Sequence, residues 1–272
     1  MNQNKTDEIF MKKNKYLKIE GHSRIDILKA ARLAGKNGAH IASSLSDVDI
    51  CLAILQNYDE RRDSFVLSKG HGALGYYAAM HQTGMISNEQ FESFETNGGD
   101  FPGQPSRSVS NKVEYSSGSL GMGLPYALGV ALGKRDRGGV VYVIVGDGEL
   151  NEGSNWEAVA LASQYKLDNL LVVVDNNSLQ SDGKCDEIVG QDLEALWNAY
   201  GWQVLKCDGH SIDDLQKAIS LNHANKPLVI LAKTIKGKGI SFMENNNFWH
   251  HATLKDEDFE KAVQEVGEKY GL

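Results

Sequence analysis

Two polar segments, each directly after an apolar run, have residue types that could bind a metal ion and a phosphate. Gly146-Asp147-Gly148 follows the run 140–145, and Asp175-Asn176-Asn177 follows the run 170–174. The Asp147 carboxylate and the Asn177 amide oxygen are hard ligands that suit Mg²⁺ or Ca²⁺. The glycines beside Asp147 would let the backbone approach a phosphate, and the helix start after them would offer free amides to an anion. Together the two segments predict a clamp for Mg²⁺ and a diphosphate, whereas Gly-Asp-Gly alone would more often be a plain strand-to-helix turn.

These segments can meet only if the surrounding elements form a parallel sheet. Apolar runs without polar alternation predict strands, and helix-like segments lie between them; this pattern is typical of a parallel sheet covered on both faces. We therefore expect a doubly wound α/β fold with a mainly parallel sheet, and such folds bind ligands at the carboxyl ends of their strands. The expected strands are 64–67, 140–145, 170–174, 202–207 and 227–233, and the expected helices are 22–36, 47–56, 76–81, 87–95, 154–166, 189–201 and 211–224.

Composition limits the function classes. The chain has 272 residues, a net charge of -8 and no apolar run near the roughly 18 residues of a membrane span. We expect a cytoplasmic protein that binds neither nucleic acid nor membrane. Its three cysteines have no CxxC spacing and indicate free thiols in a reducing compartment. Residues 1–19 are expected to be a polar extension, either a tail or a weak helix, before one domain over 20–272.

Five segments in chain order resemble the amino-terminal part of transketolases. Gly-Asp-Gly followed thirty residues later by Asn-Asn looks like the thiamine diphosphate signature, within a stretch (146–183) that is similar to the family. The other segments are KNGAHIASSLSDVDI (36–50), SFVLSKGHGALGYYA (64–78), SSGSLGMGLPYALGVAL (116–132) and ISFMENNNFWHH (240–251). The last resembles the histidine loop of short, split transketolases. The resemblance implies the thiamine diphosphate-binding fold, and specifically its diphosphate-binding domain.

The same resemblance implies roles for single residues. Asp147, the Asn177 side chain and the Leu179 carbonyl would bind Mg²⁺ (or Ca²⁺). The diphosphate would be bound by Gly148, Gly146 and His71, and the thiazolium ring would be contacted by Gly118 and Leu120. Glu152 would lie at a subunit interface near the aminopyrimidine, or would simply be a favourable acid at a helix start.

Three residues are candidates for catalysis. By the resemblance, His40 and His250 would lie above the reactive carbon of the cofactor, and histidine suits proton transfer near neutral pH. His251 is an alternative to His250. Gln104 stands in Gly103-Gln104-Pro105, where the family usually has histidine; it could bond a substrate hydroxyl but could not titrate.

Two further positions carry less specific expectations. His210 is expected to cap a helix. The lysines after the last strand, including Lys236, could help bind an anion, with a solvated loop as the default interpretation.

The resemblance also implies a missing half. In transketolases the glutamate that activates the aminopyrimidine lies in a separate pyrimidine-binding domain, which this sequence does not contain. We therefore expect one subunit of a split transketolase, active only with a pyrimidine-binding partner in a heterotetramer. The complex would transfer a two-carbon ketol unit from a ketose (phosphate) to an aldose. The alternatives are the alpha subunit of a 2-oxo-acid dehydrogenase, a deoxyxylulose-phosphate-synthase-like protein, or a noncatalytic scaffold.

Overall fold

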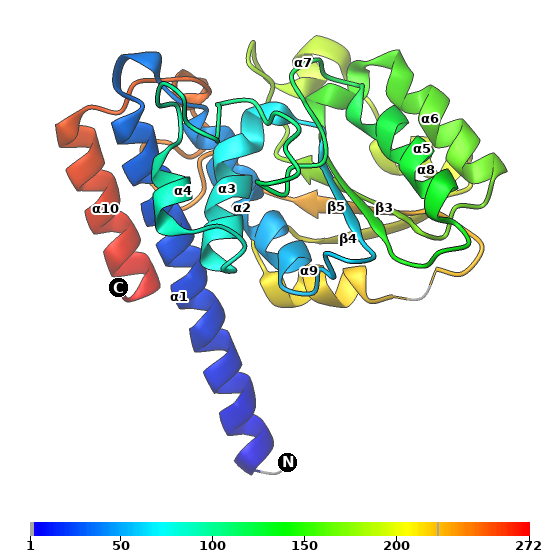
Figure 1. The fold of residues 1–272 in the computed structure, drawn as a ribbon, viewed down its shortest axis with the longest axis horizontal. Helices are drawn as coiled ribbons and strands as arrows, with labels where there is room; N and C mark the ends of the chain where they lie inside the picture. Colours follow the sequence, from blue (N-terminus) through cyan, green and yellow to red (C-terminus); the bar gives the residue numbers. More distant parts are fainter. Residues whose placement is uncertain (1–2, 222) are drawn as a thin grey trace.

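The computed structural model describes residues 3–221 and 223–272, with side chains from residue 14 onward. Its centre is a single parallel sheet with the strand order β1-β2-β3-β5-β4 (Figure 1). The strands are β1 (Ser64–Leu67), β2 (Val141–Gly146), β3 (Leu170–Asn176), β4 (Gln203–Asp208) and β5 (Leu228–Lys233). Gly146 pairs with Asp175, and Asn176 pairs with Lys233. The parallel α/β prediction is confirmed, and the two polar segments lie at the same edge of the sheet.

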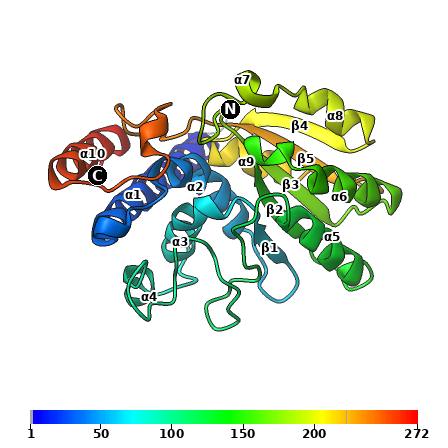
Figure 2. The ribbon, with the colours of Figure 1, turned by 90° about the horizontal axis from the view of Figure 1, so that it is seen from above.

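Strand residues point alternately to the two sides of the sheet. Both faces are apolar here, and helices cover each of them. On β3, Leu171 and Val173 join one core, while Leu170, Val172 and Val174 join the other. Figure 2 shows the two layers on either side of the sheet. One layer consists of α1 (Gln3–Leu33), α2 (Ile41–Leu55), α3 (Ala73–Gln82), α9 (Ile212–Ile219) and α10 (Asp256–Tyr270), and the other of α5 (Gly123–Lys134), α6 (Gly153–Gln164) and α8 (Leu193–Ala199).

Short elements complete the chain. Helix α4 (Asn88–Glu92) follows α3, and α7 (Cys185–Val189) follows the loop after β3. The segment 96–108 has no regular helix or strand, as its glycine, proline and serine content predicted. No helix in the described residues is long and apolar enough to cross a membrane.

The structure corrects several expected boundaries. Helix α1 starts at Gln3 rather than at 22, so the expected division at 19/20 falls inside a continuous helix; the division into extension and domain stays a prediction. Helix α2 starts at Ile41, six residues before its expected start. Helix α10 was not expected, although Asp256, Glu257 and Asp258 in its first turn and Gly271 in a left-handed conformation at its end are favourable terminal residues.

Candidate cofactor and substrate site

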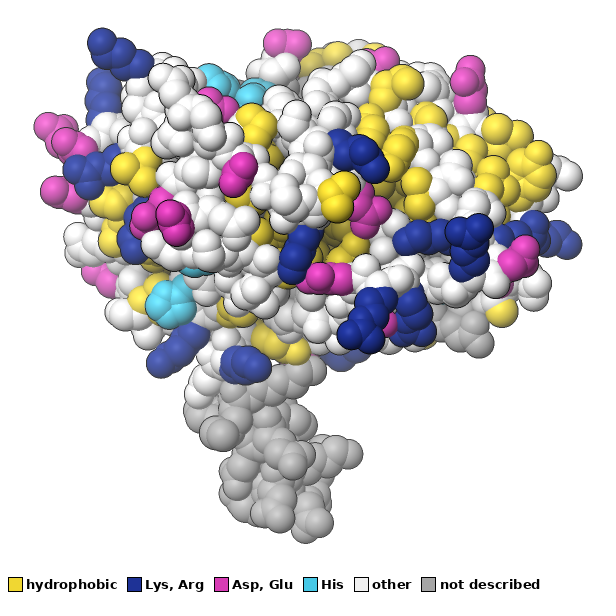
Figure 3. Space-filling model, in the orientation of Figure 1, with side chains coloured by type: hydrophobic (Ala, Val, Ile, Leu, Met, Phe, Trp, Pro, Cys, Tyr) yellow, Lys and Arg dark blue, Asp and Glu magenta, His cyan; other side chains and the backbone are white. Residues whose placement is uncertain are grey.

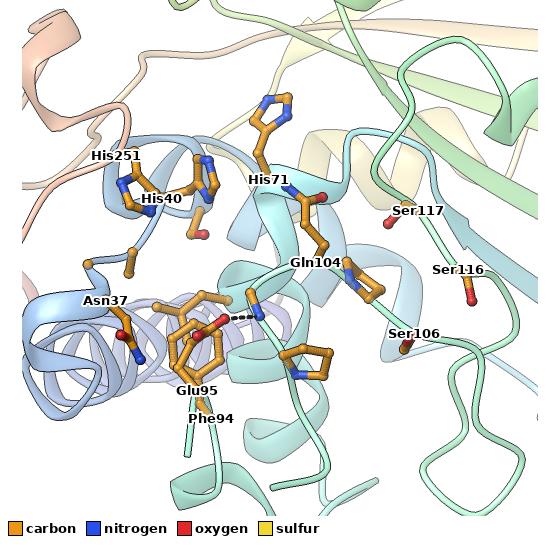
Figure 4. Close-up of a pocket in the computed structure, with 17 residues that line it drawn as sticks. Asn37, His40, His71, Phe94, Glu95, Gln104, Ser106, Ser116, Ser117 and His251 are labelled. Atoms are coloured by element: carbon orange, nitrogen blue, oxygen red, sulfur yellow. Dashed lines mark hydrogen bonds between the residues drawn. The ribbon is translucent and has the colours of Figure 1, made fainter. Parts of the chain in front are cut away.

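Two neighbouring cavities lie at the carboxyl ends of the strands, and His71 lines both. The first, here called the strand-end cavity, has a volume of about 120 Å³. It is lined by Ser43, Lys69, His71, Leu120, Gly146, Asp147, Gly148, Glu149, Asn177, Leu179, Gln180, Ser181, Lys236 and His250. The second, the loop cavity, has a volume of about 390 Å³ and is formed mainly by residues 37–40, 44, 94–95, 102–106 and 116–117 (Figure 4).

The three expected metal ligands line the strand-end cavity. The Asp147 carboxylate accepts hydrogen bonds from the backbone N–H of Gly148 at 2.8 Å and from that of Ser178. Asn177 Oδ1 accepts one from the backbone N–H of Leu179 at 3.0 Å. Burial, followed by the charge of Asp175, raises the pKa of Asp147 to about 6. A carboxylate in this electrostatic environment would be stabilised by a cation at the cavity.

Lys69 forms the floor of this cavity, and its ammonium lies among protein oxygens. Its ammonium lies 2.5 Å from Asp175 Oδ2 and 2.9 Å from Asp47 Oδ2, and it donates to Ser43 O at 3.3 Å. The contact with Asp47 is an ion pair, so among the described residues the ammonium donates two hydrogen bonds, to Asp175 and to Ser43. Lys69 therefore neutralises the buried carboxylates of Asp47 and Asp175 at the floor of the cavity.

Asp175 connects the floor to the expected metal site. Ser46 Oγ donates to Asp175 Oδ1 at 2.7 Å, and Thr234 Oγ1 donates to the same oxygen. Asn177 Nδ2 donates to Asp175 Oδ2 at 3.3 Å. Since Asn177 Nδ2 is held in this way, its amide oxygen is turned away from Asp175.

Lys236 is the second lysine in the cavity wall, and it is 2% exposed. The default interpretation as a solvated loop residue was therefore wrong for this side chain. Among the described residues its ammonium donates one hydrogen bond, to Gln180 O at 3.2 Å. Burial, then repulsion by Lys69, lowers the pKa of Lys236 to about 8. This cation has unused donors that can meet an anion.

Glu149 is a buried organising residue that the sequence reasoning missed. It is 2% exposed, and its carboxylate accepts hydrogen bonds from Gly121 N at 2.9 Å, Gly146 N at 3.1 Å and the Ser68 hydroxyl. It therefore joins the loops after β1 and β2 to the loop before α5. The available signal was its position directly after Gly-Asp-Gly.

Four histidines gather where the two cavities meet. The ring centroid of His40 lies 6.0 Å from that of His71, 5.3 Å from that of His250 and 4.6 Å from that of His251. Burial is the largest cause of the shifts that lower the pKa of His40 to about 4, that of His250 to about 3 and that of His71 well below 6.5. These three imidazoles are therefore neutral at pH 7 and can each donate and accept a hydrogen bond.

Gln104 lies in the loop cavity beside His71, as Figure 4 shows. Its Oε1 and the Ser117 hydroxyl are buried and have no hydrogen-bond partner among the described residues. Both atoms lie against Gly70, where a Cβ would overlap the amide oxygen of Gln104. A side chain at 70 would displace the Gln104 amide, so glycine at this position lets the amide approach the backbone of the loop after β1. Two unpaired buried oxygens would suit a hydroxyl-bearing ligand.

The structure does not bring every expected residue to a cavity. Gly118 and Glu152 line neither cavity, and Glu152 is exposed at the start of α6 with its Cβ close to Gly121. Leu120 does line the strand-end cavity. His210 does not cap α9, because Ser211 is the residue whose side chain accepts from Asp214 N.

This fold and site match one class of known proteins. Residues 24–271 match the family model described as "Transketolase, thiamine diphosphate binding domain". The chain is 38% identical over 242 residues to an apulose-4-phosphate transketolase subunit from Actinobacillus succinogenes, a match covering 84% of this chain and 88% of that one. It is 36% identical to a 6-deoxy-6-sulfo-D-fructose transketolase subunit from Clostridium sp., covering 87% and 91% of the two chains.

A solved structure of similar fold is the transketolase of Campylobacter jejuni, with a TM-score of 0.82 and 27% identity. The match covers 93% of this chain but 43% of that one, so the chain spans less than half the length of that enzyme. The chain belongs to the transketolase family. It corresponds to the thiamine diphosphate-binding domain of that family. The predicted family, fold and transferase class are thereby confirmed, and the dehydrogenase, synthase and scaffold alternatives are not favoured.

Proposed function

We propose that this chain binds thiamine diphosphate with Mg²⁺ in the strand-end cavity and is one subunit of a two-chain enzyme that transfers a two-carbon ketol unit. The observation that carries the proposal is the composition of that cavity. Oxygen ligands for a hard cation (Asp147, Asn177, Leu179) lie in the same wall as a buried ammonium with unused donors (Lys236), next to neutral histidines. This combination suits a metal–diphosphate group with a reactive ring beside it.

Each wall of the cavity would hold a different part of the cofactor. Asp147, Asn177 Oδ1 and the Leu179 carbonyl would bind the cation. Lys236, Gly146, Gly148 and a ring nitrogen of His71 would contact the phosphates. Gln180 would add a donor, since its buried Nε2 meets no acceptor among the described residues other than the weakly accepting thiol of Cys185. Gly118 and Leu120 would contact the thiazolium ring.

When bound, thiamine diphosphate supplies the nucleophilic carbon that attacks the ketose carbonyl. This chain's part would be to move protons and orient hydroxyls. His40 and His250, both neutral, would each be able to take a proton from a substrate hydroxyl. Removal of that hydroxyl proton would assist cleavage of the carbon–carbon bond next to the carbonyl carbon. Gln104 would bond a hydroxyl of the donor without titrating.

The proposal needs a second chain for the carboxylate that activates the aminopyrimidine. Two relatives of similar length are named as subunits of transketolases, which supports a separate partner. Apolar side chains gather over α5 and α6 (Figure 3), among them Met122, Tyr126, Leu161 and Tyr165, and Glu152 is exposed at the start of α6. We assign this surface to a heterotetramer of two chains of each kind, which would operate in the cytoplasm.

The substrate class follows from the loop cavity. Its lining contains no lysine or arginine among the described residues, whereas serines, Asn37 and Gln104 offer hydrogen bonds. This side would therefore bind the hydroxyls of a ketose, and cations that meet a phosphate or another anionic end would come from the partner. The relatives named above act on a phosphorylated and a sulfonated sugar, and both substrates have such an end.

Calorimetric titration with thiamine diphosphate tests the first half of the proposal. Saturable binding in the presence of Mg²⁺, and its loss with a chelator, is the expected result for the chain alone or with its partner.

A tagged purification followed by a ketol-transfer assay tests the second half. Robust transfer by this chain alone would contradict the split enzyme. Turnover of pyruvate instead of a ketose by the complex would favour another thiamine enzyme, and absence of cofactor binding even with the partner would favour a scaffold.

A further inference from the structure

We propose that Arg24, Asp49 and His210 form a positioning clamp that fixes Lys236 in the strand-end cavity. The inference rests on the proposed function, because it gives Lys236 the diphosphate as its ligand. None of the three clamp residues lines either cavity. They act on the segment 234–239, here called the Lys236 loop, which follows β5 and carries Lys236 at its centre.

The Lys236 loop has a path that depends on two glycines. Gly237 and Gly239 both have positive φ, at 83° and 104°, in the region that favours glycine. Gly237 N donates to Ala42 O at 2.9 Å on α2, and a Cβ on Gly237 would overlap Met243 O. A loop with two glycines has high conformational freedom when it is released, so its fixed path requires anchoring contacts.

His210 anchors the loop on the amino-terminal side of Lys236. The backbone N–H of Ile235 donates to His210 Nε2 at 2.8 Å, and His210 Nδ1 lies 2.8 Å from Asp49 Oδ2. Since Nε2 accepts a hydrogen bond, the ring proton must be on Nδ1 and is donated to Asp49. The carboxylate thus selects the tautomer that can accept the Ile235 N–H.

Arg24 anchors the loop on the carboxyl-terminal side. Its guanidinium binds Asp49 with both nitrogens, Nη1 to Oδ1 at 2.9 Å and Nη2 to Oδ2 at 2.5 Å. Its Nε donates to Lys238 O at 3.2 Å, and a Cβ on Gly239 would lie 3.0 Å from its Cδ. The connected side chains therefore contact both flanks of Lys236, at Ile235 and at Lys238.

Burial makes these contacts strong. Arg24 and Asp49 are each 1% exposed. Although burial acts to raise the pKa of Asp49, Arg24 and the hydrogen bond from His210 lower it to about 2, so the carboxylate stays ionised at neutral pH. Removing one member leaves the others with unpaired buried groups, which favours rearrangement. The Lys236 loop contains two glycines at positive φ and therefore has the conformational freedom to move.

A double-mutant cycle separates this role from plain structural support. The variants are His210→Ala, Lys236→Met and the double variant, with the dissociation constant of thiamine diphosphate measured at fixed Mg²⁺ by calorimetry. We expect each single variant to weaken binding, about 10-fold for His210→Ala and somewhat more for Lys236→Met. If His210 acts through Lys236, adding His210→Ala to Lys236→Met should change the affinity by less than about 3-fold.

Two controls address loss of stability. His210→Gln keeps a donor and an acceptor on one side chain and should recover most of the affinity lost in His210→Ala. Val159→Ala removes buried methyl groups from the core on the opposite face of the sheet. It should lower the melting temperature while leaving cofactor affinity unchanged. Multiplicative losses in the double variant, or equal losses in Val159→Ala, would overturn the clamp.

Hydrogen exchange tests the clamp independently of the cofactor. In His210→Ala the Ile235 amide loses its acceptor, so exchange across 234–239 should speed up at least about 10-fold, while Val159→Ala leaves that segment as in the unaltered protein. Unchanged exchange in His210→Ala would overturn the clamp even if the unaltered chain did not bind thiamine diphosphate. Faster exchange without any cofactor binding would instead retain the clamp and reject the proposed ligand.

Discussion

The two cavities that share His71 differ in the polar groups they leave unpaired. In the strand-end cavity the unused groups are donors: the Lys236 ammonium and the buried Gln180 Nε2. In the loop cavity the unused atoms are oxygens: Gln104 Oε1 and the hydroxyls of Ser44 and Ser117. Unpaired donors suit an anion, and unpaired acceptors suit hydroxyl groups. One cavity is thus matched to a diphosphate and its neighbour to a sugar.

The cavities also differ in what fixes their walls. The strand-end cavity lies on the ends of β1, β2 and β3, above the ion pairs of Lys69 with Asp47 and Asp175. The loop cavity depends on the segments 94–106 and 116–117, which have little regular structure. Residue changes should therefore separate the two functions. Those in the first cavity should alter cofactor affinity or folding, and those in the second should alter substrate use.

The largest expected effect is the loss of the cation site. Asp147→Ala removes the one carboxylate in the expected ligand set, so thiamine diphosphate binding in Mg²⁺ should weaken about 100-fold or more. Calorimetric titration measures the change. Asp182→Ala, at an exposed aspartate in the loop after β3, is the matched control and should bind normally. Unchanged affinity in Asp147→Ala would remove the metal site from this cavity.

The second-largest expected effect is a loss of stability at the floor of the strand-end cavity. Gly72 has an ordinary φ of -88°, yet a Cβ there would overlap Asp47 Oδ2. Because Lys69 holds that carboxylate at 2.9 Å, Gly72→Ala should lower the free energy of unfolding by about 2–4 kcal/mol. Denaturant unfolding measures this effect.

The same clash provides its own control. In an Asp47→Ala background the overlap is gone, so adding Gly72→Ala should change stability by less than about 1 kcal/mol. Gly129→Ala in α5, where a Cβ meets nothing within 4 Å, should stabilise the helix by about 0.5–1 kcal/mol. A large loss that persists without Asp47 would mean that another contact restricts position 72.

The sequence predicted the sheet and its polar strand ends because those patterns are local. The runs at 64–67 and 170–174 have no polar alternation, and the residues after the strands are small or oxygen-bearing. The register that sets Gly146 opposite Asp175 then follows from parallel pairing. Strand order could not be predicted, because it depends on which faces the connecting helices cover.

Long-range pairing explains what could not be predicted from the sequence. Nothing near Lys236 in the chain indicates that it is buried, because its anchors are Asp49 and His210, far away in sequence. Glu149 likewise has an ordinary sequence context, and its role depends on Gly121 and Ser68. The expected positions of His40 and His250 came from resemblance to a family, and the structure places their ring centroids 5.3 Å apart.

A change in the loop cavity should leave the strand-end cavity intact. Gln104→Ala removes the buried amide, and we expect kcat/KM for ketol transfer by the reconstituted complex to fall about 10-fold, the effect of one neutral hydrogen bond to a substrate hydroxyl. The affinity for thiamine diphosphate should stay within about 2-fold of its original value, the error of such comparisons. Asn97→Ala, at an exposed position of the same loop, should change neither quantity. A fall in cofactor affinity that matched the fall in kcat/KM would show that the two cavities are not separable.

The smallest expected effect is the pH dependence of stability that is due to the histidines where the two cavities meet. His250 has its pKa lowered from 6.5 to about 3, chiefly by burial, so the unfolded chain binds more protons there than the folded chain between these values. Stability is therefore lost as the pH falls below 6.5, and it is fully retained above. His250→Gln removes this penalty and should gain about 1 kcal/mol relative to the unaltered protein between pH 7 and pH 5, allowing for its partial exposure. Thermal unfolding of His250→Gln and of the unaltered protein at both pH values measures this gain. The contributions of all other titrating groups are the same in the two proteins and are removed by subtraction. A difference close to zero for His250→Gln would mean that water reaches the histidine cluster freely.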